Sequence, residues 1–321
     1  METQAIAEPM TVQAEKTSPA AQSSVPIPSH GKSRRMKLME RRGCFGELPS
    51  EVTITRAISL DDLCEAYKLV HDNYIQEGYI SPHSSGVRIR PYETAPETAT
   101  FIAKAHGRII GVTSGVIDSD DLGVPADKAF KKEIDDLRLQ GYKVCEGTNW
   151  VIAPEYRSTN VMPELMRVCF AYSIAQGCNG MLATVSPNHG HFYEMLCFEQ
   201  VGTERSSSPD IDDPVVLQLN SYDEFYRCWR AVQPGEVSDA EVVTSFFIAN
   251  NPYYKRVQEW TRIAEAEFMK PAFLHELFVN RSGFLNECSD NEFEAIRERW
   301  GERFMWHVWG DSARRELALT A

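Results

Sequence analysis

The spacing of hydrophobic residues between positions 51 and 220 changes repeatedly, and this succession constrains the fold more than any other feature. Alternating apolar residues predict β-strands, whereas apolar residues three and four positions apart predict amphipathic helices. Strand patterns occur at 51–58, 98–105, 108–118, 144–152, 180–186, 198–202 and 214–220, and helix patterns occur at 60–74, 127–140, 160–177 and 189–197.

The order of these patterns predicts an α/β fold. A strand and a helix come first, three strands follow with a charged helix before the last of them, and then come helix, strand, helix and two strands. His106-Gly107 separates two strand patterns closely enough for a hairpin, because Gly supplies the positive φ of a tight turn. The two strand-helix-strand segments within 144–202 suggest parallel neighbours. We therefore expect a mixed, partly parallel central sheet covered by helices.

Strand patterns stop after about residue 220. Ser238 with Glu241 and Ser289 with Glu292 have the spacing of helix capping boxes. We therefore expect a sheet domain at 51–220 and a C-terminal helical subdomain at 221–321. The many aromatic residues of the second segment are typical of a packed core, although they could also line a long apolar pocket.

Residues 1–50 differ in composition from the rest of the chain. Residues 1–30 are rich in Ala, Ser, Thr, Gln and Pro, a composition that buries too little apolar surface to offset the entropy of ordering. Lys and Arg are then concentrated in residues 32–42. We expect a disordered tail followed by a solvated basic linker, and the alternative is a basic segment that holds an acidic partner or a lipid surface.

The overall charge and composition exclude several classes of partner. The chain has 33 Lys and Arg residues against 46 Asp and Glu residues, a net charge of −13 that disfavours nucleic acid. No run approaches the ~20 apolar residues of a bilayer-spanning helix, so membrane contact is expected to be peripheral at most. The 8 cysteines are scattered without a C-x-x-C pair, which favours reduced thiols and a cytoplasmic location.

Three stretches, GRIIGV, CEGTNWVIAPEYR and above all SPNHGHFYEMLCFEQVG, resemble the GNAT superfamily of N-acyltransferases. Within it, YKLVHDNYIQEGYI, DSDDLGVPADKAFKKEIDDLR and the Glu-x-Thr strand are most similar to the long-chain N-acyl amino acid synthases, which are relatives of the acyl-homoserine-lactone synthases. The resemblance covers residues 51–220. It implies a GNAT fold whose parallel strands 144–152 and 180–186 splay apart to hold the pantetheine arm of an acyl thioester. The implied activity is transfer of a long-chain acyl group to an amine such as an amino acid.

Tyr193 is the candidate general acid for this reaction. GNAT enzymes often place a Tyr four residues before the Gly-Phe that starts the next strand, and this chain has the same spacing with Cys197 in place of Gly. A phenol, with an ordinary pKa near ~10, can protonate a thiolate whose thiol has a pKa near ~8.5. The alternative is that Tyr193 is an aromatic residue that packs its helix onto the sheet.

Glu146 is the candidate general base. It is an acidic residue within an apolar strand, where a carboxylate is costly unless it has a function or a partner, and the related synthases have a glutamate at this position. Two arginines of the family are absent, because Asn149 and Val70 stand in their places. Loss of these cations implies a different amine or reduced activity, and a strand-end ion pair is the alternative role for Glu146.

The resemblance also implies a set of substrate contacts. A backbone N–H near Trp150 or Val151 is the usual donor to the oxyanion in this fold. No tightly bound cofactor is expected, and no metal site is predicted, since His189 and His191 lack further ligands at a suitable spacing. The candidate substrate-binding residues are Tyr74, Tyr79, Asn149, Trp150, Val151 and Asn188.

The segment 157–164 bears on the acyl donor. Users of acetyl-CoA commonly have a Gly-containing loop there, whose free N–H groups bind pyrophosphate. This segment has no Gly, Pro163 removes one N–H, and Glu164 adds negative charge. Acyl-ACP, with an acidic acyl-carrier protein as partner, is therefore the expected donor, although the net charge of the chain opposes that encounter. The basic surface expected to bind the carrier comprises Arg88, Arg90, Lys131, Lys132 and residues 32–42.

Two other functions remain open from the sequence. One is a CoA-dependent GNAT enzyme that acts on a small amine or a protein. The other is a catalytically weak, acyltransferase-like protein that binds an acyl group or a partner, which the two missing arginines would favour.

Overall fold

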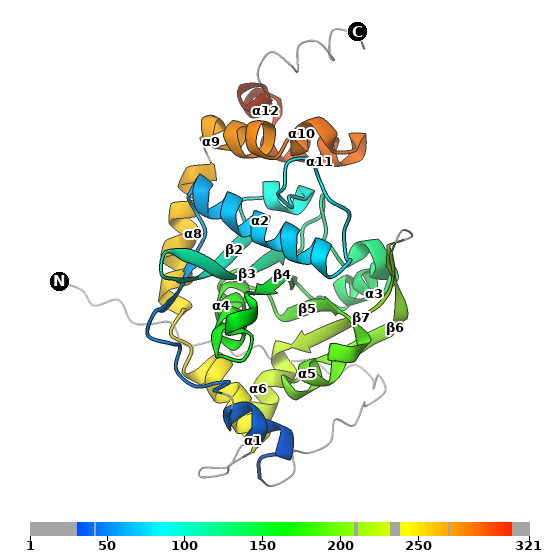
Figure 1. The fold of residues 1–321 in the computed structure, drawn as a ribbon. Coiled ribbons are helices and arrows are strands. Elements are labelled where there is room, and N and C mark those ends of the chain that lie inside the picture. The colour runs from blue at the N-terminus through cyan, green and yellow to red at the C-terminus, as the bar shows by residue number, and fades with distance from the viewer. Residues whose placement is uncertain (1–30, 42, 209–210, 232–237, 269, 310–321) are drawn as a thin grey trace, which may run out of the picture.

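The computed structural model describes residues 31–41, 43–208, 211–231, 238–268 and 270–309. The segment 1–30, predicted to be a disordered tail, lies outside the described residues. Within the described residues, the chain forms a central sheet with helices on both faces and at both ends (Figure 1).

The sheet is mixed, as the sequence predicted. Its seven strands, counted over the described residues, lie in the order β1-β2-β3-β4-β5-β7-β6. Only β4 and β5 are hydrogen-bonded in parallel. The second predicted strand-helix-strand segment gives no parallel pair, because β7 lies between β5 and β6 and is antiparallel to both. The strands are β1 Val52–Arg56, β2 Ala99–Ala105, β3 Arg108–Ile117, β4 Val144–Ile152, β5 Gly180–Val185, β6 Glu199–Ser208 and β7 Ile211–Ser221.

The predicted hairpin between β2 and β3 is confirmed. His106 and Gly107 have φ angles of 52° and 77°, the positive values that the primed hairpin turns require. The turn brings Ala105 opposite Arg108 and sets the register at this end of β2 and β3.

Helices cover the two faces of the sheet in separate sets. Helices α2 and α3 share one face, where Val112, Val144 and Leu182 are buried. Helix α4 covers the other face against Ile110, Cys145 and Met181. The N-cap of α2 is Ser59, whose hydroxyl accepts from the N–H of Asp62. These helices, with α5, are α2 Leu60–Gln76, α3 Asp127–Leu139, α4 Val161–Ala175 and α5 Gly190–Met195.

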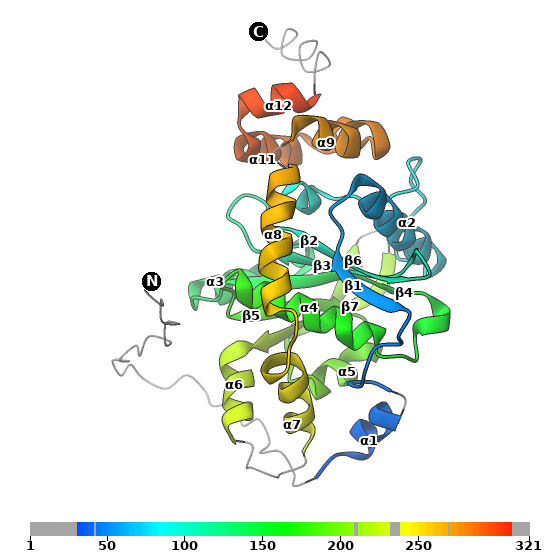
Figure 2. The same cartoon turned by 90° about the vertical axis from the view of Figure 1, so that its left-hand side faces the viewer.

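The helices after β7 pack in two groups against the cores of the sheet. Helices α6 and α7 bury Phe225 and Val243 on the α4 face, and the helices from α9 onward bury Phe278 and Ile296 against α2. Helix α8 runs between the two groups, beside α4 (Figure 2). The division of the chain near residue 220 stays a prediction. The helices are α6 Tyr222–Ala231, α7 Asp239–Thr244, α8 Tyr254–Phe268, α9 Pro271–His275, α10 Phe284–Glu287, α11 Asp290–Trp300 and α12 Glu302–Trp309, with π-helical turns at Ser245–Ala249 and Glu276–Arg281.

The basic segment predicted to be a solvated linker forms a helix instead, α1, Arg34–Arg41. Met36 is fully buried in the core beneath α4. The side chain of Ser33 accepts from the N–H of Met36 at 3.0 Å at the start of the helix. The burial of Met36 and this hydrogen bond help to stabilise a short helix that composition alone did not predict.

Candidate active site

The parallel strands β4 and β5 separate where the sequence resemblance predicted. Their residues pair at Val144 with Gly180, Cys145 with Met181 and Glu146 with Leu182. Beyond this point β4 continues to Ile152 and β5 to Val185 without further pairing between them. The gap opens toward the ends of the strands from which the chain leads into α4 and α5.

A β-bulge in β4 forms part of the wall of this gap. Asn149 and Trp150 together lie opposite the single residue Thr113 of β3, between the pairs Ser114 with Thr148 and Val112 with Val151. Asn149 has a φ of 56°, in the left-handed region that Asn tolerates better than most residues. The bulge changes the direction of β4 close to Glu146, which is the last residue of β4 that pairs with β5.

Glu146 lies at the point where the strands separate. Its side chain is buried, its Oε2 accepts from the backbone N–H of Ala126 at 2.7 Å, and its Oε1 accepts from the hydroxyl of Thr184 on β5 at 3.1 Å. Burial raises the pKa of Glu146 to about 7, and the two hydrogen bonds and the charge of Arg90 limit the rise. A carboxyl group with this pKa can accept a proton near neutral pH.

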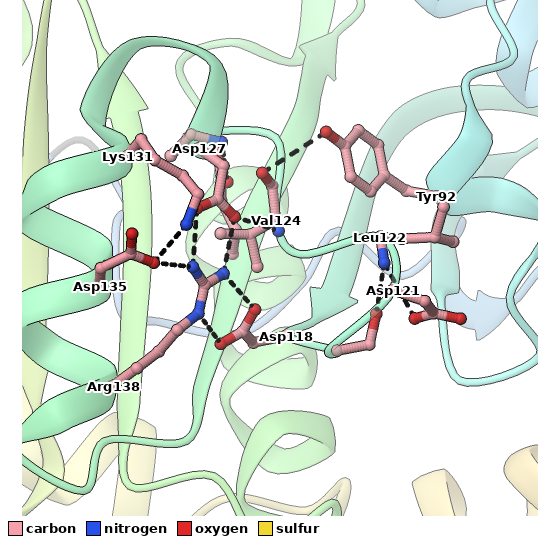
Figure 3. A network of polar contacts seen from close by, with 12 residues as sticks. Tyr92, Asp118, Asp121, Leu122, Val124, Asp127, Lys131, Asp135 and Arg138 are labelled. Atoms are coloured by element: carbon pink, nitrogen blue, oxygen red, sulfur yellow. Dashed lines mark hydrogen bonds and ion pairs between the residues drawn. The ribbon is translucent and has the colours of Figure 1, made fainter. Parts of the chain in front are cut away.

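The N–H that binds Glu146 is held in place by an ion-pair cluster around Arg138 of α3 (Figure 3). The Arg138 guanidinium donates to Asp118 at 2.6 Å and to Asp127 at 2.7 Å. Asp127 in turn accepts from the N–H of Val124 at 2.8 Å. The segment between Asp118 and Asp127, which includes Ala126, is therefore fixed at both ends.

Arg88 and Arg90 lie inside the site and not on a carrier-binding surface, so their predicted exposure was wrong. The side chain of Arg90 is 13% exposed and pairs with the buried carboxylate of Glu93 at 2.5 Å. Burial works against the charge of Arg90, but Glu93 holds its pKa above the usual value. Arg88 donates to Oδ1 of Asn149 at 2.6 Å. A charged side chain turns inward here because the site supplies polar partners.

The contact between Arg88 and Asn149 shows that the site has a cation although the family arginine is missing at position 149. Asn149 is fully buried, and its amide nitrogen donates to Ser114 at 3.1 Å and to Glu93 at 3.3 Å. Its oxygen is the partner of Arg88. The 78–90 loop thus brings a cation to the place on β4 where the sequence lacks one.

Arg88 has no carboxylate partner among the residues that the structure describes. Its guanidinium lies over the ring of Tyr74, 5.0 Å from the ring centre. Burial and the nearby charge of Arg90 lower the pKa of Arg88 to about 10, so it stays protonated at neutral pH. The site therefore contains a positive charge that only neutral and aromatic groups contact directly.

Tyr193 lies on α5 in the core of the α4 face. Its ring makes edge contacts with Phe192 and Phe198, with ring centres 5.6 Å and 5.2 Å away. Its hydroxyl makes no hydrogen bond within the described part of the chain. Burial raises the pKa of Tyr193, and the nearby Tyr74 and Cys169 raise it further. Tyr74 on α2 and Cys169 on α4 are therefore both near the phenol.

The other predicted contact residues lie in different environments. Tyr74 packs edge-on against Tyr79, 5.6 Å between ring centres, and Tyr79 is 37% exposed. Val151 is buried in the core on the α2 face. Asn188 is exposed in the turn before α5.

Trp150 packs on the opposite side of β4 from Val151, against the core on the α4 face. Its ring Nε1 is buried and has no hydrogen-bond partner among the described residues. A buried N–H without a partner is unusual and is available to a ligand.

The first turn of α4, where acetyl-CoA users bind pyrophosphate, is covered by the N-terminal part of the chain. Asn160, buried just before this helix, accepts from the N–H of Phe45 at 2.7 Å and donates to the carbonyl of Gly46. The carboxylate of Glu164 forms an ion pair with Arg167 at 2.8 Å and accepts a hydrogen bond from the hydroxyl of Tyr253 at 2.8 Å. The residues on this turn make contacts within the protein that a pyrophosphate would have to replace.

Among the described residues, no group of three His, Cys, Asp or Glu side chains has an arrangement suited to a metal ion. No helix in the described part of the chain is long and apolar enough to cross a membrane.

Comparison with known proteins identifies the class of this fold and site. Residues 65–220 match the family described as N-acyl amino acid synthase FeeM. The solved structure of FeeM from uncultured soil microbes is 18% identical, with 54% of this chain and 92% of that chain covered and a TM-score of 0.48. The AHL synthase LasI is 16% identical, with 52% and 88% covered and a TM-score of 0.39. A GNAT-family acetyltransferase from Streptococcus pneumoniae is 16% identical, with 53% and 99% covered and a TM-score of 0.39. No curated protein matches the chain.

The separated strands β4 and β5 lie within residues 65–220, the segment that matches the N-acyl amino acid synthase family, so this segment is an acyltransferase domain. The resemblance to the N-acyl amino acid synthases that the sequence predicted is confirmed over residues 65–220. N-acyltransferase activity is therefore the general function of this domain.

Sequence reasoning missed Arg88 as a residue of the site interior and Thr184 and Ala126 as partners of Glu146. The alternation of strand residues could have placed Thr184 on the same face as Glu146, because the two strands are parallel neighbours. No signal in the sequence predicts the direction in which an arginine on a loop points.

Proposed function

We propose that this protein transfers a long-chain acyl group from the phosphopantetheine thioester of an acyl-carrier protein to the amino group of an amino acid. The observation that best supports this proposal is the buried Glu146 carboxylate, with a pKa of about 7, at the point where β4 and β5 separate. A proton acceptor therefore lies beside the gap between the two strands, where an acyl thioester would bind.

In the proposed reaction, Glu146 takes one proton from the substrate ammonium, directly or through one water. The neutral amine then attacks the thioester carbonyl carbon, a C–N bond forms and the C–S bond breaks. Tyr193 donates its phenol proton to the leaving thiolate. The nitrogen then gives up its second proton, which reprotonates Tyr193. The free hydroxyl of Tyr193 supports this role.

The negative charge on the carbonyl oxygen needs hydrogen-bond donors while the tetrahedral intermediate exists. We propose a backbone N–H of the β4 bulge, near Trp150 or Val151, as one such donor. The unpaired Nε1 of Trp150 supports a role for this residue in binding the donor arm.

Arg88 supports an acceptor that carries a carboxylate. A guanidinium in a largely buried place gains most from an anion, and Arg88 has only Asn149 and Tyr74 as direct partners among the described residues. An α-carboxylate bound there would neutralise the charge and orient the adjacent amine. Tyr74 and Tyr79 would then contact the side chain of the amino acid.

Two observations at α4 support a carrier protein in place of CoA. The first turn of the helix is covered by residues 45–46, and Pro163 lacks an N–H. A carrier-bound phosphopantetheine needs no pyrophosphate site there, whereas CoA would have to displace these contacts. A CoA-dependent enzyme and a catalytically weak binding protein remain the alternatives.

The experiment is a transfer assay with the purified protein. The same acyl chain is supplied on holo-acyl-carrier protein and on CoA, with a panel of amino acids and their decarboxylated amines as acceptors. Mass spectrometry measures both products of the reaction, the N-acyl amino acid and the freed thiol. We expect product with amino acids and faster turnover from the carrier protein.

The Glu146→Gln variant is the matched control, because it keeps the shape of the side chain and removes the proton acceptor. Acetyl-CoA used as well as or better than the acyl carrier would contradict the proposed donor. Product formation by Glu146→Gln at the wild-type rate would contradict the proposed base.

A further inference from the structure

Helix α1 and the turn after it lie outside the segment that matches the family, yet they contact both helices at the open end of the gap. Arg35 donates through Nη1 to the carbonyl of His191 on α5 at 3.3 Å. Phe45 donates through its N–H to Asn160, just before α4, at 2.7 Å. The N-terminal segment therefore joins the starts of α4 and α5, where the gap between β4 and β5 opens.

This segment is part of the folded body of the protein. Met36 is fully buried, and the N–H of Ser33 donates to Asp239 of α7 at 2.8 Å. The ring of Phe45 packs edge-on against Phe246, with 5.3 Å between ring centres. These contacts come from three different parts of the segment, so they fix which face of α1 points outward.

The outward face of α1 is basic. Arg34, Arg35, Lys37 and Arg41 are exposed, and none of them forms an ion pair with a described residue. Leu38, among them, is 47% exposed. Four cations without an ion pair to a described residue, around an exposed apolar side chain, fit an acidic surface with an apolar contact at its centre.

We propose that the outward face of α1 is the surface that docks the acyl-carrier protein. This inference rests on the proposed function and assigns a place to the partner. A carrier protein must deliver its phosphopantetheine arm to the end of the gap where α4 and α5 begin, and α1 lies there. Its unpaired charges act at short range, where they offset the repulsion from the net negative charge of the protein.

The other basic residues that the sequence suggested for docking have a different environment. Lys131 and Lys132 lie on α3, which covers the opposite face of the sheet from α4. Lys131 pairs with Asp135, and Lys132 pairs with Asp136 at 2.8 Å. Their charge is already matched by acidic residues, so they provide a control for charge reversal elsewhere on the surface.

The test compares Arg34→Glu/Arg35→Glu/Lys37→Glu with Lys131→Glu/Lys132→Glu in the full-length protein. The donors carry the same acyl chain, once on holo-acyl-carrier protein and once as the N-acetylcysteamine thioester, which has no protein surface. Direct binding of holo-carrier protein is measured by titration calorimetry, which does not depend on turnover. Binding to vesicles that contain anionic phospholipid is measured in parallel.

We expect the α1 variant to lower the ratio of kcat/KM values for the carrier donor over the small thioester by at least about tenfold. Carrier binding should weaken to the same extent and lose most of its dependence on salt. The α3 variant should keep the wild-type ratio. An Arg34→Lys/Arg35→Lys variant should also keep it, which separates charge from shape.

A ratio that stays within about twofold of wild type in the α1 variant, or carrier binding that is unchanged, would overturn the docking surface. Loss of vesicle binding with an unchanged carrier ratio would also overturn it and would assign the face to a lipid surface. Failure of the proposed function has a different result, because neither donor would then yield product with the wild-type protein.

Discussion

Replacing Glu146 with Gln should stabilise the protein at alkaline pH while it removes the proposed proton acceptor. The folded protein raises the pKa of this carboxyl from its ordinary 4.5 to about 7. Between these values the folded state holds a proton that the unfolded state has released, so the contribution of Glu146 to stability falls as pH rises through this window. At about 1.4 kcal/mol per pKa unit, the whole window corresponds to about 3 kcal/mol.

Gln does not titrate, and it can keep both contacts of the carboxylate. Its oxygen can accept from the N–H of Ala126, and its amide can donate to the hydroxyl of Thr184, which then acts as an acceptor. The free energy of unfolding of Glu146→Gln, relative to wild type, should therefore increase by up to about 3 kcal/mol between pH 4.5 and pH 8.

Urea unfolding of both proteins at pH 5 and pH 8 measures this difference. Glu93→Gln is the matched control, because the carboxylate of Glu93 is also buried but pairs with Arg90 at 2.5 Å. The Glu93→Gln variant should leave the charge of Arg90 without its carboxylate partner and destabilise the protein by about 3 kcal/mol or more near neutral pH. A pH-independent difference between Glu146→Gln and wild type would refute the reasoning about burial of Glu146.

Three further variants test the other residues of the site. Tyr193→Phe should lower kcat about tenfold to a hundredfold with an alkyl thioester and much less with an aryl thioester, whose thiolate needs no proton to leave; equal losses with both donors would indicate a packing role. Arg88→Met should lower kcat/KM for an amino acid about 10- to 100-fold relative to its decarboxylated amine, with Arg88→Lys in between, and an unchanged preference would exclude Arg88 as the carboxylate site. Arg138→Met should release the N–H of Ala126 from Glu146 and move the acidic limb of the pH-rate profile upward by up to about one pH unit, and a lower rate with an unmoved limb would show that Arg138 acts on stability alone.

The sequence predicts the sheet domain well because its elements depend on local spacing. The hairpin at His106-Gly107, the N-cap at Ser59 and the strand that carries Glu146 all follow from residues close together in the chain. The insertion of β7 between β5 and β6 does not, because it depends on which sheet edge is free when the last strands pair. Local patterns contain no information about that choice.

Part of the candidate site could also be predicted. Glu146 stands out because an acidic residue in an apolar strand has to be compensated, and the structure supplies two donors to it. Arg88 and Arg90 could not be placed, because they lie on a loop whose path depends on contacts with Asn149 and Glu93. The absence of an arginine at position 149 therefore did not mean the absence of a cation from the site.

The helix α1 could not be predicted from the sequence either, because it also depends on tertiary contacts. Its eight residues are too few for a helical period to be distinguished from a charged linker, and isolated helices of this length are unstable in water. Burial of Met36 against a distant part of the chain stabilises it. Tertiary contacts of this kind do not appear in local composition.

The proposed base can be tested most directly by the pH dependence of acyl transfer. The rate at which acyl-carrier protein loses its acyl chain to an amino acid is followed by intact-protein mass spectrometry from pH 5.5 to pH 9. The wild-type rate should fall on the acidic side with an apparent pKa of about 7, the value to which burial raises Glu146. In Glu146→Gln this limb should be absent, and the rate at pH 8 should be about 10²- to 10⁴-fold lower. A Glu146→Gln variant that keeps both the acidic limb and the wild-type rate would contradict the assignment of Glu146 as the base.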